Sequence, residues 1–186
     1  YMTRIGVLAA LAIVLFQIQI PVVAFYQLDF SNLPVLLGAF SMGPIPGLII
    51  LAIKAAICCL NTHTAMIGEL ADFIMGAAFI LPAALIYRHK KNRKDAVVGM
   101  VVGTLCMIVA GCLTNAFILI PFYINAFGMP MEAIIGMGTA VLPFVDTELK
   151  LILCITAPFN LLKGALLCLL TYLLYKRLSP LLHVRK

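Results

Sequence analysis

Five polar side chains lie inside segments that are otherwise apolar, and their types suit the binding of a polar ligand. They are two acids, two amides and one ammonium group: Glu69, Asp72, Asn115, Asn160 and Lys163. A charged group inside a membrane-spanning helix costs about 2.5 to 3.5 kcal/mol on insertion scales, so such groups are candidates for function. Residues three apart share one face of a helix, as the two acids do and as Asn160 does with Lys163.

The five side chains also share a depth. At a rise of about 1.5 Å per residue, each lies roughly 20 to 30 Å from the charged residue that ends its segment on the basic side. A polar cavity open to the outside is the simplest explanation. Two other interpretations stay open: Lys163 could be a counter-ion for either acid, and Asn115 could hydrogen-bond a neighbouring helix. Lys54 could pair with Asp29 or point into the cavity.

The segments that contain these residues predict an all-α integral membrane protein. The sequence is 64% hydrophobic and 11% charged, which leaves too little polar surface to cover a soluble globule. Backbone groups in lipid must be hydrogen-bonded internally, so such segments form helices. Connections are expected at 21–30, 43–47 and 128–146, where Pro, Gly or polar residues gather. We predict one domain over 1–186 with six transmembrane helices, at 3–23, 33–42, 47–60, 67–87, 96–120 and 147–175.

Basic residues give the orientation of this bundle. Five of the 13 Lys and Arg residues lie at 88–94, between two segments long enough to cross a bilayer, and such loops stay in the cytoplasm. Six crossings then place both termini in the cytoplasm, in agreement with Arg4 and the basic C-terminal tail. The net charge of +6 is therefore a topology signal, with a secondary affinity for anionic membrane lipid, and no nucleic-acid partner is expected.

The sequence has no motif for hydrolysis or metal binding. It contains no GxxxxGK[ST] phosphate loop, no HExxH helix and no GxSxG elbow. Its six cysteines lie in apolar segments, without a CxxC pair or a histidine at ligand spacing. We therefore expect no enzymatic activity, no metal site and no cofactor.

Six stretches resemble one family of membrane proteins across nearly the whole chain: LDFSNLPVLLG (28–38), MGPIPGLIILAIK (42–54), IGELADFIMGA (67–77), NAFILIPFY (115–123), APFNLLKG (157–164) and LLYKRLSPLL (173–182). They are similar to the S component of an energy-coupling factor (ECF) vitamin transporter, in its riboflavin-specific branch. The resemblance implies a six-helix subunit of the bacterial plasma membrane that captures riboflavin from outside. It also implies partners for import: a transmembrane coupling (T) subunit and two ATPase subunits.

By motif, the resemblance assigns ligand-binding roles to two groups of residues. One group would hydrogen-bond the polar edge or the ribityl hydroxyls of the flavin: Glu69, Asn115, Asn160 and Lys163. The other group, in the first loop, would close over the flavin ring: Phe25, Tyr26 and Leu28. Asp72 joins the site from its position beside Glu69, although the family often has Asn there. Riboflavin is expected as the transported ligand and not as a cofactor.

The first span contains a candidate surface for docking the coupling subunit. In the family this docking uses alanines four apart on the first helix, and the nearest match here is Gly6 with Ala10, beside Ala9. Small side chains let another helix approach closely. Ordinary packing inside the bundle is the alternative interpretation of this stripe.

Two other functions remain open from the sequence. One is an S component that selects another vitamin or precursor on the same scaffold. The other is a proton-coupled carrier of small molecules, in which Glu69 and Asp72 titrate and Lys163 is their counter-ion. Such a carrier would work without ATPase partners, whereas an S component would require them.

Overall fold

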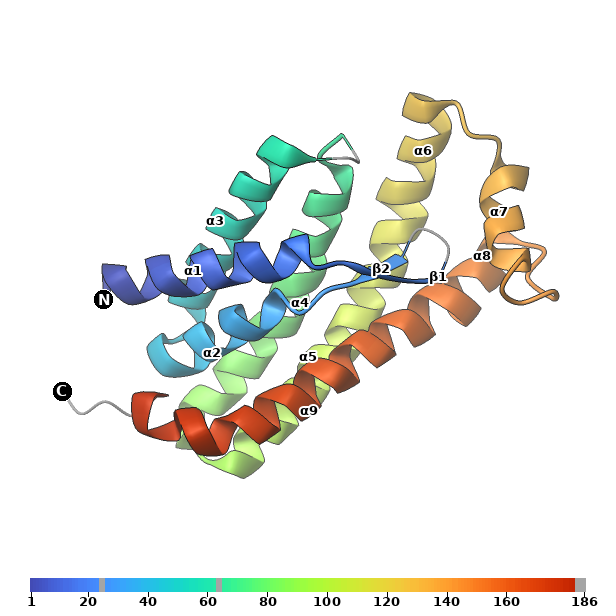
Figure 1. The fold of residues 1–186 in the computed structure, drawn as a ribbon. Helices are drawn as coiled ribbons and strands as arrows, with labels where there is room; N and C mark the ends of the chain where they lie inside the picture. The colour runs from blue at the N-terminus through green and yellow to red at the C-terminus, as the bar shows by residue number, and fades with distance from the viewer. Residues whose placement is uncertain (24–25, 63–64, 183–186) are drawn as a thin grey trace.

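The computed structural model describes residues 1–23, 26–62 and 65–182, and most of them are helical. Figure 1 shows that the first residues of α1 and the last residues of α9 lie on the same side of the molecule. In chain order the elements are α1 Met2–Gln17, β1 Ile20–Val23, β2 Tyr26–Leu28, α2 Asn32–Met42, α3 Pro44–Cys58, η1 Cys59–Asn61, α4 Ile67–Lys90, α5 Arg93–Thr114, η2 Asn115–Leu119, α6 Ile120–Phe127, α7 Met131–Thr139, α8 Glu148–Leu151, η3 Ile152–Thr156 and α9 Ala157–Leu182.

Within the described residues, four helical runs are long and apolar enough to cross a membrane: Pro44–Asn61, Ile67–Lys90, Arg93–Phe127 and Glu148–Leu174. The other two predicted spans are also apolar helices, but α1 has 16 residues and α2 has 11. At about 1.5 Å per residue, α2 extends only ~16 Å against a hydrocarbon core of about 30 Å. Each predicted segment is therefore helical over most of its length, and the count of six crossings stays a prediction.

The first predicted span ends early. α1 stops at Gln17, and residues 20–23 pair with residues 26–28 as the antiparallel hairpin of β1 and β2. Pro21 explains the difference, because proline has no N–H to donate and disfavours helical backbone at Ile20 before it. The predicted helix therefore becomes a hairpin, which extends from the end of α1 toward α6 and α9 (Figure 1).

Two short turns join neighbouring helices. Between α2 and α3 the chain reverses at Gly43, whose φ of +108° favours glycine, and Pro44 begins α3. The turn predicted over 43–47 is therefore shorter than expected, because prolines are tolerated in the first turn of a helix. In the basic turn between α4 and α5, the Asn92 side-chain oxygen caps α5 by accepting the Asp95 N–H at 2.7 Å.

The backbones of α4 and α5 approach each other closely. Gly99 and Gly103 lie four residues apart on α5, and a Cβ added at these positions would clash with the carbonyl oxygens of Ala83 and Phe79. Small residues four apart are a common means of close helix packing in membranes. The two helices therefore hold the acids of α4 and the amide that follows α5 at a fixed separation.

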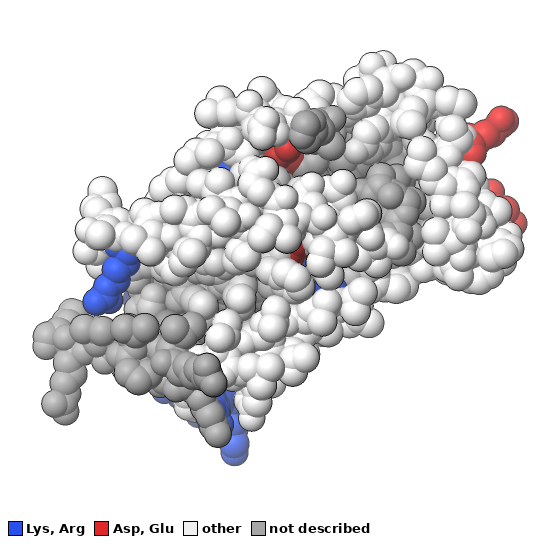
Figure 2. Space-filling view, viewed as in Figure 1, with Lys and Arg blue, Asp and Glu red and all other residues white. Residues whose placement is uncertain are grey.

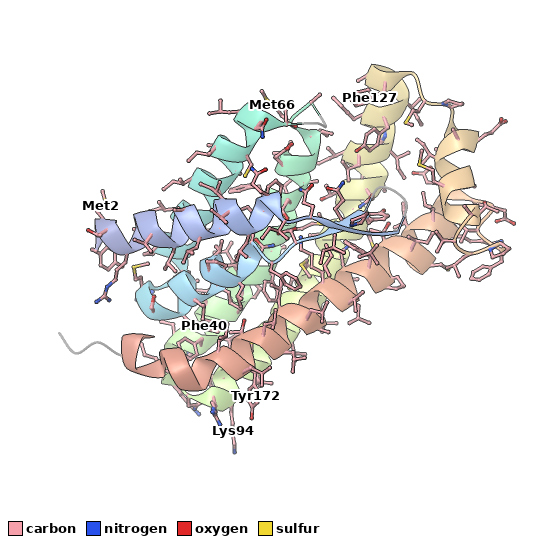
Figure 3. All side chains as sticks on the ribbon, viewed as in Figure 1. Met2, Phe40, Met66, Lys94, Phe127 and Tyr172 are labelled. Carbon is pink, nitrogen blue, oxygen red and sulfur yellow. The ribbon has the colours of Figure 1, made fainter. Side chains whose placement is uncertain are left out.

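The connection after α6 is more ordered than predicted. Part of it forms α7, which joins α8, η3 and the hairpin in the smaller of two apolar clusters, around Val145 and Ile155. The larger cluster is formed mainly by α1 to α5, around the fully buried Phe79 and Ile80. In Figure 3, Met66 and Phe127 lie at one end of the molecule and Lys94 and Tyr172 at the other.

Candidate ligand-binding cavity

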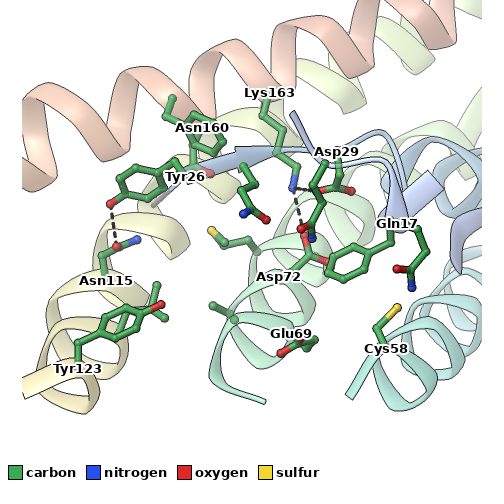
Figure 4. Close-up of a pocket in the computed structure, with 18 of the residues that line it drawn as sticks. Gln17, Tyr26, Asp29, Cys58, Glu69, Asp72, Asn115, Tyr123, Asn160 and Lys163 are labelled. Atoms are coloured by element: carbon green, nitrogen blue, oxygen red, sulfur yellow. Dashed lines mark hydrogen bonds and ion pairs between the residues drawn. The ribbon is translucent and has the colours of Figure 1, made fainter. Parts of the chain in front are cut away.

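A cavity of about 410 Å³ is lined by segments from across the chain, and its volume falls within the range of small-molecule sites. Its walls come from the end of α1, the hairpin, the turn before α4, α4 itself, the α5 to α6 run and α9 (Figure 4). The charged lining residues are Asp29, Glu69, Asp72 and Lys163, and the aromatic ones are Phe16, Tyr26, Tyr123 and Phe159.

Four buried charges and one hydroxyl form a closed ring at one wall of the cavity. The Lys163 ammonium donates to Asp29 at 2.8 Å and to Asp72 at 3.1 Å (Figure 4). Lys54 donates to the second oxygen of Asp72 and, at 2.8 Å, to the Ser31 hydroxyl. That hydroxyl donates in turn to Asp29, which closes the ring. Two cations offset two anions, so the ring is neutral, and it ties the end of the hairpin to α3, α4 and α9.

Two helices are locally widened beside the cavity, and each widening precedes a proline. Asn115–Leu119 and Ile152–Thr156 are π-helical turns, and the helices that follow them contain Pro121 and Pro158 at their second position. A proline inside a helix lacks a donor and clashes with the carbonyl four residues earlier, and a π turn accommodates both defects. The interruption predicted at Pro158 is therefore a π turn within a continuous helix.

The Tyr26 hydroxyl joins the two π turns. It donates to Asn115 Oδ1 at 2.8 Å and lies 2.5 Å from Thr156 Oγ1. Burial raises the pKa of Tyr26, so this hydroxyl keeps the proton that it donates. The Tyr26 ring also packs on Phe159, with 5.1 Å between the centroids. Tyr26 thus fastens the hairpin to both helices that line the far side of the cavity.

The two amides predicted at this depth are oriented by their own helices. Asn115 Nδ2 donates to the Gly111 carbonyl at 2.9 Å, and Asn160 Nδ2 donates to the Thr156 carbonyl at 3.0 Å. Gly111 also leaves room for Asn160, because a Cβ at that position would clash with the Asn160 amide. Both amides line the cavity in fixed orientations.

Glu69 lies in the first turn of α4, where a carboxylate interacts favourably with the helix dipole. It accepts a hydrogen bond from the Thr62 hydroxyl at 2.9 Å. The same hydroxyl accepts the Met66 N–H at 3.1 Å, so the turn before α4 and the acid are held together. This acid therefore faces the cavity from a fixed position near the beginning of α4.

The polar residues predicted from the sequence come together in this cavity. Of the eight residues predicted to bind ligand, six line it: Tyr26, Glu69, Asp72, Asn115, Asn160 and Lys163. Leu28 is instead buried in the smaller apolar cluster, and Phe25 lies outside the described residues. Lys163 is also a counter-ion of Asp72, as the alternative interpretation required. Ligand contact by these side chains stays a prediction.

Other polar lining residues were not predicted as ligand-binding: Gln17, Gln19, Gln27, Asp29 and Asn61. Three glutamines within eleven positions, at the end of an apolar span and around Pro21, are the signal that could have found them. The pairing of Lys54 with Asp29 is wrong. Lys54 pairs with Asp72 on the adjacent helix, whereas Asp29 forms its ion pair with Lys163 and accepts a hydrogen bond from the Ser31 N–H.

The small residues of α1 are divided between two faces of the helix. Gly6 and Ala10 are exposed, whereas Ala9 is buried in the larger apolar cluster. The exposed pair is free to meet another helix, while Ala9 packs inside the bundle. Docking of a partner at Gly6 and Ala10 stays a prediction.

The described residues combine four helical runs long enough to cross a membrane with a cavity that has the volume of a small-molecule site and is lined by aromatic and polar side chains. A family model for the substrate-specific component of ECF transporters matches residues 1–175. The chain therefore belongs to this family, and it is a multi-pass, substrate-binding subunit in the bacterial cell membrane. A solved structure described as the S component of a bacterial ECF transporter has a TM-score of 0.78 at 30% identity, covering 98% of this chain and 97% of that chain.

Curated relatives have more specific names. Riboflavin transporter RibU of Staphylococcus aureus (strain TCH60) is 32% identical over 179 residues, which are 94% of this chain and 88% of that protein. Riboflavin transporter FmnP of Bacillus subtilis (strain 168) is 25% identical over 182 residues, with 95% and 90% covered. Riboflavin transporter RibU of Lactococcus lactis subsp. cremoris (strain NZ9000) is 27% identical over 174 residues, with 87% and 84% covered.

Proposed function

We propose that this protein captures riboflavin from outside the cell for ATP-driven import. The observation that carries the proposal is the cavity of about 410 Å³, which combines aromatic faces with amides and charges. Riboflavin has a flat tricyclic ring with a polar edge and a chain of hydroxyls, so it needs both kinds of contact. The three relatives described above are named riboflavin transporters, which supports the same ligand.

In this proposal the amides and charges orient the flavin. Asn115, Asn160 and Lys163 hydrogen-bond its polar edge and its hydroxyls, and Glu69 accepts from a hydroxyl. The packed rings of Tyr26 and Phe159 offer an aromatic face to the tricyclic ring. The protein binds its ligand without transforming it, and riboflavin is cargo and not a cofactor.

We also propose six crossings with both termini in the cytoplasm. Figure 2 shows exposed Lys and Arg atoms at the end that holds the N-terminus and the α4 to α5 turn, and exposed Asp and Glu atoms at the opposite end, over α7 and α8. Loops rich in Lys and Arg stay in the cytoplasm, so the acidic end faces outside. Placing a cysteine in the α4 to α5 turn and labelling it from each side of the membrane tests this orientation.

The proposed partners are a transmembrane coupling (T) subunit and two ATPase subunits. The exposed Gly6 and Ala10 of α1 form the proposed contact with the coupling subunit. Leucine at both positions should abolish co-purification of the partners while riboflavin binding by the isolated subunit stays unchanged. Co-purification at the wild-type level would contradict this docking surface.

The first experiment on function is the absorption spectrum of the protein purified in mild detergent without added ligand. Flavin bands near one per protein, or quenching of added riboflavin fluorescence, support the proposal. Asn160→Ala should weaken the binding, whereas Lys150→Met, at an exposed lysine away from the cavity, should not. A colourless protein that fails to quench riboflavin contradicts the ligand, and uptake without ATPase subunits contradicts the ATP-driven mechanism.

A further inference from the structure

Lys54 is a buried cation that the proposed flavin contacts do not use. Its side chain is 1% exposed and lies behind the residues that line the cavity. All three of its N–H donors have acceptors: an Asp72 carboxylate oxygen at 2.5 Å, the Ser31 hydroxyl at 2.8 Å and the Asn32 side-chain oxygen at 3.4 Å. An ammonium buried in a membrane bundle is costly, so its presence requires a compensating role.

Lys163 is bound differently, although it belongs to the same ring. It donates to Asp29 at 2.8 Å and to Asp72 at 3.1 Å, and these are its acceptors among the described residues. An ammonium group has three donors, and Lys163 lines the cavity. One N–H of Lys163 therefore remains for an acceptor inside the cavity, whereas Lys54 has none to offer.

Asp72 links the two lysines. One of its oxygens accepts from Lys54 and the other from Lys163, so the two ammonium groups share its negative charge. Without Lys54, the two carboxylates of the ring would have Lys163 as their single cation, and the ring would have a net charge of −1. The excess negative charge would draw the Lys163 ammonium toward Asp29 and Asp72 and away from the cavity.

We propose that Lys54 is a positioning residue for the ligand, which neutralises Asp72 from behind and so leaves Lys163 one N–H donor for the flavin. Lys54 itself touches no ligand and acts through Asp72. The inference rests on the proposed capture of riboflavin, because it explains how the contact from Lys163 to the flavin is kept available. It also assigns a function to a charge that lies outside the cavity.

The test compares riboflavin dissociation constants, measured by fluorescence quenching, for wild type, Lys54→Met and the double variant Lys54→Met/Asp72→Asn. The single variant leaves an uncompensated buried carboxylate, so its affinity should fall about tenfold or more. The double variant loses the Asp72 carboxylate at the cavity wall but keeps the neutral pair of Lys163 and Asp29, so it should bind at least about threefold more tightly than Lys54→Met. Lys150→Met, which removes an exposed lysine paired with Asp146 at 2.6 Å, should bind as wild type does.

Each outcome decides a separate point. No binding by wild type overturns the proposed function itself. Equal affinity of wild type and Lys54→Met overturns the positioning role, and so does a double variant that binds no better than the single one, as expected if Lys54 only fills space. If Lys54→Met does not fold, the double variant decides, because the remaining pair of Lys163 and Asp29 must let it fold and bind riboflavin, and a folded double variant without binding overturns the role through Asp72.

Discussion

Replacing Tyr26 by Phe should weaken ligand binding, because it loosens the β1–β2 hairpin from the two helices that line the cavity. The substitution keeps the ring that packs on Phe159 but removes a hydroxyl that is 2.8 Å from Asn115 Oδ1 and 2.5 Å from Thr156 Oγ1. Leaving buried polar groups without a partner costs about 1 to 3 kcal/mol. If the hairpin must be fastened for the ligand to be retained, this cost corresponds to an affinity lower by about 5-fold to 150-fold.

Riboflavin titration and stopped-flow dissociation in detergent would measure this effect, and most of the loss should appear as faster dissociation. Tyr172→Phe is the matched control, because Tyr172 is 45% exposed at the other end of the molecule. Thr156→Val removes one of the two Tyr26 hydroxyl contacts from the η3 side, so combining it with Tyr26→Phe should cost less than the sum of the two single variants. Unchanged affinity and dissociation in Tyr26→Phe would refute the conclusion that the Tyr26 hydroxyl holds the hairpin over the ligand.

Three further predictions concern packing and surface charge. Gly103→Ala should lower the melting temperature, since its Cβ would meet a backbone oxygen of α4 and overpacking costs about 1 to 3 kcal/mol. Gly111→Ala should weaken riboflavin binding in a fluorescence titration, because its Cβ would displace the Asn160 amide. The hydrogen bond from Lys150 lowers the pKa of Asp146, so Lys150→Met should raise that pKa toward its ordinary value, as measured by NMR.

The controls for these predictions use positions with different surroundings. Gly6→Ala should keep the melting temperature, since its Cβ would have nothing within 4 Å, and an equal loss there would contradict the packing argument. Wild-type affinity in Gly111→Ala would contradict a fixed Asn160 amide. The ion pair of Asp146 stabilises the fold above the ordinary carboxyl pKa, and that contribution is lost as the pH falls through the lowered value. A loss on raising the pH would contradict this sign.

The position of the cavity could be predicted from the sequence, because a single rule, the cost of polar side chains in lipid, determines it. Charged and amide side chains are costly in lipid, so their common depth located the cavity before any packing was known. Glu69, Asn115 and Lys163 come from different helices and still meet there. The six helical segments were predictable for the same reason, because lipid leaves the backbone few alternatives.

Partners and local backbone shape were not predictable, because they depend on which helices are adjacent. Asp29 was the expected partner of Lys54, but the adjacency of α3 and α4 and the pairing of Asp29 with Lys163 select Asp72 instead. The π turns before Pro121 and Pro158 depend on how each helix accommodates a proline, which periodicity does not reveal. The end of α1 could have been predicted more accurately, because Pro21 disfavours a helix that continues to residue 23.

The charged ring joins the beginning of the chain to its end. Asp29 and Lys163 are 134 positions apart, so at a synthesis rate of about 5 to 20 residues per second the hairpin emerges roughly 7 to 27 s before its partner lysine is made. Lys54 and Asp72 are made within this interval, but the nascent chain cannot close the ring before Lys163 is added. A product truncated before α9 would have Lys54 as the single cation for Asp29 and Asp72, so the ring could not close and its buried groups would have a net charge of −1.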